Sequence, residues 1–139
     1  DTKMSKSIPE GCVFLMEKPE DILRKFKRAI TDSDTERCVR FDPQAKPGVS
    51  NLMQIYSAVT GKSFETIEAE FDGKGYGAFK PAVGEAVVEL LRPIREETER
   101  LLADKGYLES VYRAGAEKAS YVAEKTLRKV YKKVGFLAR

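Results

Sequence analysis

Residues 79–94 read FKPAVGEAVVELLRPI and carry the longest helical pattern in the chain. Apolar side chains recur there at steps of three or four residues, which places them on one face of an α-helix. The five positions of this face are Phe79, Val83, Val87, Leu90 and Ile94. Pro93 lies within the stripe and predicts a kink, because it removes one backbone donor. We therefore expect one long helix with a buried face and a bend at this proline.

Residues on the N-terminal side of this pattern predict three shorter helices. The first spans about 19–31 by the spacing rule, since it starts with a proline and its acidic residues precede its basic ones, as the helix dipole favours. The second starts near Val49 and ends at Gly61 in a left-handed conformation. Ser63 then caps a short acidic helix that runs through Phe71. Polar segments rich in turn-forming residues connect these helices.

Residues 72–77 read DGKGYG and predict a tight chain reversal. A dinucleotide-binding loop is not indicated, because such a loop follows a strand, whereas an acidic helix precedes this segment. The long helix is expected to stop at 104–106, and a final helical stretch covers 107–134 with Gly115 as a break between two helices. Together these patterns predict an all-α fold, a bundle of about five to six helices preceded by a flexible loop.

The composition excludes several classes of protein. The 139 residues amount to one domain, and no apolar run approaches the length of a membrane span. Histidine is absent, which rules out a Ser-His-Asp unit, a Cys/His zinc site and an imidazole acid or base. Cys12 and Cys38 are the only cysteines and are expected to stay as thiols, since nothing indicates an oxidising compartment.

Charge is unevenly distributed along the chain. The 25 basic and 22 acidic residues leave a net charge of +3, which by itself does not indicate a nucleic-acid partner. Residues 113–139 hold eight basic and two acidic residues, whereas 62–72 hold one lysine and four acids. Five lysines of the last helix share the face opposite an apolar stripe, namely Lys118, Lys125, Lys129, Lys132 and Lys133. This face fits either an RNA backbone or solvated lysines that the helix dipole favours near a C-terminus.

The polar segment Lys3-Met4-Ser5-Lys6-Ser7 has the chemistry of a phosphate clamp. Lys3 and Lys6 are three residues apart, so both ammonium groups can reach one side, and Ser5 and Ser7 can donate hydrogen bonds to phosphate oxygens. The alternative is an ordinary flexible N-terminal arm with solvated lysines. The chain starts with an aspartate and not with methionine, which leads us to expect a fragment of a longer protein.

The same five residues match letter for letter the KMSKS signature of class I aminoacyl-tRNA synthetases, and the chain resembles the bacterial tryptophanyl-tRNA synthetases over nearly its whole length. The runs that carry the resemblance, in order, are 29–33 (AITDS), 46–52 (KPGVSNL), 55–57 (IYS) before 60–61 (TG), 70–80 (EFDGKGYGAFK) and 115–119 (GAEKA). The tyrosine enzymes are a distant second. The family continues its signature with Asp-Pro, where this chain has Ile8-Pro9. Two cysteines are too few for the four thiolates of the iron–sulfur cluster found in some members.

The resemblance implies a class I tryptophan–tRNA ligase whose Rossmann-type catalytic domain, with the tryptophan pocket, lies before residue 1. Residues 1–18 are then the KMSKS loop with its linker, and 19–139 are the helical anticodon-binding domain. The resemblance further implies that Lys3 and Lys6 are catalytic and that all five signature residues, Lys3, Met4, Ser5, Lys6 and Ser7, bind ATP. Mg²⁺ bridges the nucleotide in this scheme, and the chain itself binds no metal.

The same resemblance implies contacts with tRNA(Trp), and spacing alone does not choose among the candidates Lys62, Lys74, Tyr76, Lys118 and Lys125. It also implies a cytoplasmic enzyme with no membrane partner, which is a homodimer when intact. The fragment by itself is expected to be monomeric and inactive. The alternative, from a different functional class, is a free-standing helical RNA-binding or structural module with no catalysis.

Overall fold

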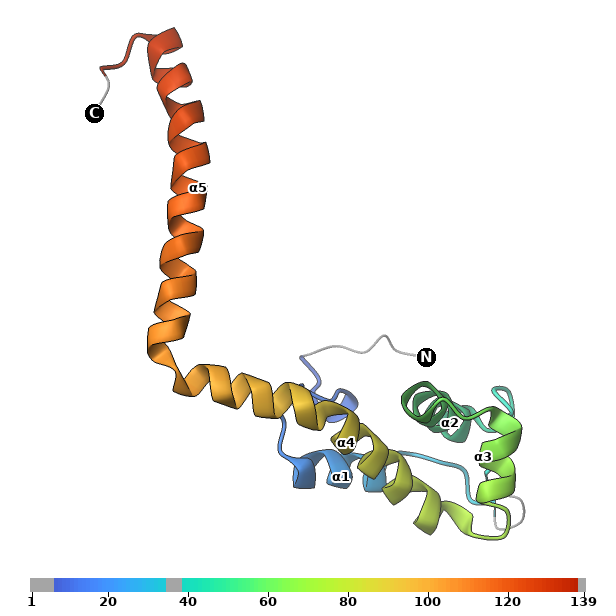
Figure 1. Cartoon of the computed structure of the whole chain (residues 1–139). Helices are drawn as coiled ribbons and strands as arrows, with labels where there is room; N and C mark the ends of the chain where they lie inside the picture. Colours follow the sequence, from blue (N-terminus) through green and yellow to red (C-terminus); the bar gives the residue numbers. More distant parts are fainter. Residues whose placement is uncertain (1–6, 35–38, 138–139) are drawn as a thin grey trace. The chain divides into compact units, whose positions relative to one another are not determined.

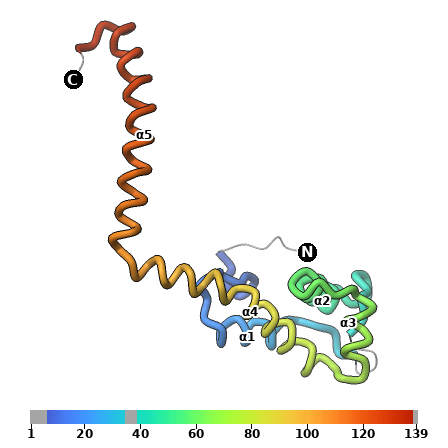
Figure 2. The backbone as a smooth tube through the Cα atoms, in the orientation of Figure 1, coloured from blue at the N-terminus to red at the C-terminus, as the bar shows by residue number. Residues whose placement is uncertain are grey.

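The structure is a computed structural model that describes residues 7–34 and 39–137 (Figure 1). Within these residues it contains helices and no strand, which confirms the predicted all-α fold. The helices are a short 3₁₀-helix η1 (Pro9–Gly11), then α1 (Pro19–Arg28), α2 (Pro47–Thr60), α3 (Phe64–Glu70), α4 (Gly75–Ala103) and α5 (Lys105–Val134). Figure 2 traces the same path as a tube. Residues 1–6 of the predicted loop and linker at 1–18 lie outside the described residues, as does Cys38.

The chain divides into two compact units, Asp1–Arg95 and Glu96–Arg139, and the division falls inside α4. The described part of the first unit holds η1, α1, α2, α3 and most of α4, whereas the second unit holds the end of α4 and α5. None of the described helices combines the length and the apolar character that a membrane crossing requires. The division into 1–18 and 19–139 expected from the sequence stays a prediction.

The core of the first unit forms around the apolar face of α4. Phe79, Val83, Val87 and Leu91 are buried on this face, and they join one cluster with buried side chains of the other elements. These partners are Ile22 and Phe26 of α1, Val49, Leu52, Met53 and Tyr56 of α2, Ile67 of α3, and Val39 and Phe71 in the connections. Figure 1 shows α1 and α4 side by side. Removal of this apolar surface from water is the main favourable term in the stability of the unit.

The buried face of α4 differs in part from the predicted stripe. The prediction was wrong at Leu90 and Ile94, whose side chains are 52% and 45% exposed, and Leu91 is buried instead. Residues three or four positions apart lie on the same face of a helix, so the pattern alone does not choose between Leu90 and Leu91. In the structure the residues that face the core are four positions apart, from Phe79 to Leu91. The helix assignment continues through Pro81 and Pro93 without interruption. The kink at the second proline stays a prediction.

Several predicted helix ends are confirmed. Pro19 occupies the first helical position of α1, and Gly61 ends α2 with a φ of 74° in the left-handed region. The Ser63 hydroxyl accepts a hydrogen bond from the N–H three residues later and so caps α3. α4 ends at Ala103, next to the predicted stop at 104–106, but α5 starts at Lys105 and not at 107, because the Asp104 carboxylate caps it in the same way as Ser63 caps α3. The predicted chain reversal is present at 72–74, where Gly73 adopts a positive φ, but residues 75–77 already belong to α4, whose first residue Gly75 also has a positive φ.

The predicted break at Gly115 is wrong. α5 is one uninterrupted helix from Lys105 to Val134, and Gly115 is not among the glycines with positive φ. A glycine inside a helix costs only about 1 kcal/mol relative to alanine, so the helix-favouring residues around it decide the outcome. Ion pairs between residues four apart, such as Glu109 with Arg113, add to this helix. None of the described residues of α5 is buried.

Gly48 lets the start of α2 approach the chain that follows α1. α1 ends at Arg28, three residues before its predicted end, and the chain then passes close to α2. A Cβ atom added at Gly48 would lie 2.3 Å from the backbone oxygen of Ile30, a separation that real Cβ atoms do not adopt. Gly84 of α4 faces α1 more loosely, since an added Cβ would lie 3.1 Å from Leu23 Cδ2. A side chain can move aside, whereas the backbone at Ile30 cannot do so cheaply.

We expect Gly48→Ala to lower the free energy of unfolding by about 1–3 kcal/mol, the usual cost of forcing extra atoms into a packed region. The measurement is urea-induced unfolding followed by circular dichroism. Gly77→Ala is the matched control, because an added Cβ there meets nothing within 4 Å. This control is expected to be at least as stable as the unsubstituted chain, since alanine favours the helix. Equal stabilities for the two variants would contradict the close approach at Gly48.

Candidate functional site

The predicted phosphate clamp is described only at its C-terminal end. Lys3, Met4, Ser5 and Lys6 lie outside the described residues, so the structure does not test their predicted role. Ser7 is described and exposed, and one residue, Ile8, separates it from η1. The structure therefore describes how the chain leaves the clamp residues and joins the helical body.

Three of the predicted tRNA-binding residues belong to the first unit. Lys62 has partners within the fold, because its Nζ lies 2.5 Å from Glu70 Oε2 and 5.4 Å from the centre of the Tyr56 ring. Lys74 is exposed in the turn before α4. Tyr76 is partly buried near the start of α4, where its hydroxyl takes part in a polar cluster. The structure thus leaves Lys74 more accessible than Lys62 and Tyr76.

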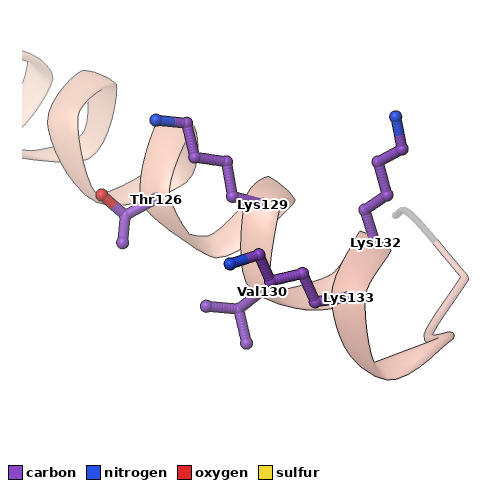
Figure 3. A pocket seen from close by; sticks show the side chains of 5 residues that line it. All are labelled: Thr126, Lys129, Val130, Lys132 and Lys133. Atoms are coloured by element: carbon purple, nitrogen blue, oxygen red, sulfur yellow. The ribbon is translucent and has the colours of Figure 1, made fainter.

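The other two predicted tRNA-binding residues belong to the second unit. Lys118 and Lys125 lie on α5 and are exposed. They are seven residues apart, so two helical turns bring them to the same face. Further along α5 a shallow hollow is lined by Thr126, Lys129, Val130, Lys132 and Lys133. Figure 3 shows the three lysine side chains of this hollow projecting from the last turns of the helix.

A buried lysine that the helical patterns did not single out joins three segments of the first unit. The side chain of Lys46 is 5% exposed, and its Nζ lies 3.1 Å from Asp32 Oδ1 and 2.9 Å from Asp34 Oδ2. Lys46 also donates a hydrogen bond to the Tyr76 hydroxyl at 3.2 Å, and that hydroxyl donates to Asp32 Oδ1 at 2.6 Å. We call Asp32, Asp34, Lys46 and Tyr76 the Lys46 cluster.

Hydrogen bonds set the protonation states of the Lys46 cluster. Burial acts to raise the pKa of Asp32, but hydrogen bonds from Tyr76, the Asp34 N–H and Lys46 outweigh it and lower the pKa from 3.8 to about 2. Burial acts to lower the pKa of Lys46, and its bonds to Asp34, Tyr76 and Asp32 raise it instead. Burial and the bond to Asp32 raise the pKa of Tyr76 to about 12. The cluster is therefore an ion pair with a neutral tyrosine near neutral pH.

The Lys46 cluster connects separate segments of the fold and leaves one carboxylate oxygen without a hydrogen-bond donor. Its pKa values lie far from neutrality, which makes general acid–base catalysis there unfavourable. Asp32 Oδ2 is buried without a hydrogen-bond partner, and a shallow hollow beside it is lined by Asp32, Ser33, Asp34, Arg40, Ala45 and Lys46. Across residues 7–34 and 39–137, no group of three or more His, Cys, Asp or Glu side chains is placed to hold a metal ion.

Comparisons with known proteins agree with the sequence resemblance. A family model described as "tRNA synthetases class I (W and Y)" matches residues 1–92. The chain belongs to this family. A tryptophan–tRNA ligase of Clostridium tetani is 48% identical over 137 residues, which make up 97% of this chain and 40% of that protein. A tryptophan–tRNA ligase of Wolinella succinogenes is 49% identical over the same share of this chain and 41% of its own length.

Solved structures of this family also match the fold. A tryptophanyl-tRNA synthetase crystal structure from Campylobacter jejuni has a TM-score of 0.78 and 25% sequence identity, and the match covers 96% of this chain and 42% of that one. A crystal structure from Mycoplasma pneumoniae has a TM-score of 0.61 with 28% identity. The chain thus spans about two fifths of the length of the curated relatives it matches. These relatives match beyond residue 92, where the family model ends, and so reach into the second unit.

Three of the runs that resemble the tryptophanyl-tRNA synthetases meet in the Lys46 cluster. Asp32 belongs to AITDS, Lys46 begins KPGVSNL, and Tyr76 lies within EFDGKGYGAFK. These residues are 14 and 44 positions apart in the chain, but their side chains are in direct contact. No helical or strand period relates such positions, so spacing could not have predicted the cluster. The resemblance itself was the available signal, because it selected all three runs.

We expect Lys46→Met to lower the free energy of unfolding by about 3 kcal/mol, because it leaves two carboxylates and a partly buried tyrosine without their cation. This expected loss is at the low end of the cost of breaking a buried ion pair, since both carboxylates are partly exposed and can be rehydrated. Urea unfolding at neutral pH measures the change. Lys27→Met on the exposed side of α1 is the matched control and is expected to stay within about 0.5 kcal/mol of the unsubstituted chain. A loss of similar size in both variants would contradict the contribution assigned to the cluster.

The low pKa of Asp32 predicts a loss of stability in acid. A carboxylate whose folded pKa lies below its unfolded value stabilises the fold above the unfolded pKa, and this contribution is lost as the pH falls through the folded pKa. The stabilisation by the Asp32 carboxylate amounts to about 2 kcal/mol, and it is lost as the pH falls from about 4 to about 2. The measurement compares urea unfolding of the unsubstituted chain and of Asp32→Asn across this range. We expect the stability gap between them to narrow toward pH 2, and a constant gap would contradict the assignment.

Proposed function

We propose that the chain is the C-terminal portion of a tryptophan–tRNA ligase, which uses ATP to activate tryptophan and then transfers it to tRNA. The observation that carries the proposal is the 48% identity with the Clostridium tetani ligase over 97% of the chain. The chain also keeps all five letters of the KMSKS signature. Identity of this extent over both units favours a shared function over a shared fold alone.

In the proposed reaction the tryptophan carboxylate attacks the α-phosphate of ATP, and the bond to pyrophosphate breaks. The tryptophanyl group then passes from the adenylate to tRNA with release of AMP. Negative charge builds on the leaving pyrophosphate in the first step, and the proposed role of Lys3 and Lys6 is to stabilise it. Ser5 and Ser7 donate hydrogen bonds to phosphate oxygens, and ATP enters as its Mg²⁺ complex. A Campylobacter jejuni relative solved with ADP and tryptophan supports ligands of these two kinds.

We propose that the chain has two functional parts, the KMSKS loop with its linker at 1–18 and the anticodon-binding helices at 19–139. Lys118 and Lys125 support this role, because they present two cations on one exposed face of α5. Lys74 is also exposed and suits a direct contact with tRNA. The side chains of Lys62 and Tyr76 already have partners within the fold. We therefore propose that these two residues shape the surface that contacts tRNA.

We further propose that the intact ligase is a cytoplasmic homodimer that binds tryptophan in a domain preceding this chain. The 139-residue portion alone is then an inactive monomer. The alternative is a free-standing helical RNA-binding or structural module, and the basic face of α5 is compatible with it. The two proposals differ on whether the reading frame continues upstream of Asp1 into a nucleotide-binding domain.

We expect Lys3→Ala and Lys6→Ala each to slow tryptophan-dependent ATP–pyrophosphate exchange by the intact ligase about 100- to 1,000-fold. This is the usual cost of removing one donor that stabilises transition-state charge, about 3–4 kcal/mol. Binding of ATP should change little, because the charge that the lysines stabilise develops only in the transition state. The assay follows incorporation of labelled pyrophosphate into ATP.

Lys27→Ala is the control for these two variants, since it also removes one lysine but from an exposed position on α1. It is expected to exchange pyrophosphate at the unsubstituted rate. Full exchange by both clamp variants would mean that residues 3–7 are an ordinary N-terminal arm. A reading frame that encodes no nucleotide-binding domain upstream of Asp1 would favour the helical module with no catalysis.

A further inference from the structure

We propose that Lys25 is a positioning residue of the ligase, because it fixes the segment through which the KMSKS residues join the helical body. The inference rests on the proposed function, in which Lys3 and Lys6 act on ATP phosphates. The contacts that support it all lie within the described residues, between α1, α4 and residues 8–17. Lys25 does not itself contact the clamp residues in this scheme, so it acts through the position of the segment.

The segment after Ser7 is a hydrogen-bonded turn and not a free linker. The Gly11 N–H donates to the Ile8 carbonyl oxygen at 3.1 Å, and the Cys12 N–H donates to the Pro9 carbonyl oxygen at 3.4 Å. Cys12, at the end of this turn, is buried. A chain that leaves the clamp at Ser7 therefore enters a closed turn at once, and the position of Cys12 determines where that turn lies.

The ammonium group of Lys25 holds both ends of the segment 12–17. Its Nζ donates to the Cys12 carbonyl oxygen at 2.7 Å and lies 2.6 Å from Glu17 Oε1. The same Nζ lies 5.4 Å from the centre of the Phe14 ring. The side chains of Lys25 and Glu17 are only 23% and 12% exposed, so water screens this pair less than it screens a surface pair.

Glu17 extends the attachment from α1 to α4. Its Oε2 accepts a hydrogen bond from the Phe14 N–H at 3.1 Å, and its own N–H donates to the Phe14 carbonyl oxygen at 3.0 Å. Arg95 of α4 donates to the Glu17 carbonyl oxygen at 3.4 Å. The segment is thus tied to the two helices that lie side by side in the core of the first unit.

Apolar burial holds only part of this segment. Cys12 is buried and Val13 packs against the core, but Phe14, Leu15 and Met16 are exposed. The rest of the segment therefore depends on the polar contacts made by Lys25, Glu17 and Arg95. Lys25 contacts both ends of the segment from a single atom, so its loss would release the Cys12 carbonyl group and the Glu17 carboxylate together. A shift of about 1 Å at a distance from the chemistry can cost about 100-fold in rate.

The test is Lys25→Met in the intact ligase, with Lys25→Arg as the conservative variant and Lys27→Met as the matched control on the same helix. We expect Lys25→Met to lower kcat of tryptophan-dependent ATP–pyrophosphate exchange about 10- to 100-fold, with the KM for tryptophan unchanged. Lys25→Arg should restore most of the rate, because a guanidinium keeps the charge and the donors. Lys27→Met should behave as the unsubstituted enzyme.

A second measurement reports the position of the segment directly. In the intact ligase with every cysteine except Cys12 replaced by serine, Cys38 included, the rate of maleimide labelling follows exposure of the Cys12 thiol. We expect faster labelling in Lys25→Met and the original slow labelling in Lys25→Arg. If Lys25→Met loses helical content, Glu17→Gln replaces it in both assays, since it removes the charge partner and keeps the shape. The Glu17→Gln variant should shift both readouts in the same direction by a smaller factor.

The outcomes separate this inference from the proposed function. A normal exchange rate in Lys25→Met, together with a large loss in Lys6→Ala, would overturn the positioning role and leave the clamp intact. Faster labelling of Cys12 with an unchanged kcat would also overturn it, because Lys25 would then only stabilise the fold. Normal exchange in both Lys6→Ala and Lys25→Met would instead refute the proposed function of the clamp.

Discussion

Burial of one face of α4 is the constraint on which the rest of the first unit depends. The ring of Phe79 is fully covered, and it meets Tyr56 and Phe71 edge-on, with ring centres 6.1 Å and 5.1 Å away. Edge-to-face pairs of this kind add to the free energy of area burial. Gly84 on the same helix lets α1 come close, and side chains of α2 and α3 join the same cluster around α4. The polar functional features of the unit are attached to this apolar frame.

Ammonium groups hold the connecting segments that the core cannot hold by burial. Lys46 joins the loop after α1 to the start of α4 through Asp32 and Tyr76, and Lys25 joins the chain after Ser7 to α1. A cation taken out of water is costly unless carboxylates and hydrogen bonds compensate it, and both lysines have such partners. An intact buried ion pair adds little net stability, whereas removal of one partner leaves an uncompensated charge and is strongly destabilising.

The second unit is organised by different physics. No described residue of α5 is buried, and its apolar side chains Leu127, Val130 and Val134 are about half exposed. The described contacts that stabilise α5 are its own backbone hydrogen bonds and its ion pairs between residues four apart. The predicted opposition of an apolar and a basic face follows from the helical period, and the continuous helix through Gly115 extends both faces along its length.

The sequence by itself determined the features whose signals are local. Pro19, Gly61 and Ser63 marked helix ends correctly, because proline geometry, left-handed glycine and side-chain caps act within a single turn. The ordered runs identified the family for the same reason, since each is a continuous string of residues. Only the tertiary structure decided that Leu91 and not Leu90 is buried, and that Lys46 meets Asp32 and Tyr76. Those outcomes depend on which surfaces pack together, and no periodicity relates Asp32, Lys46 and Tyr76, which are 14 to 44 positions apart.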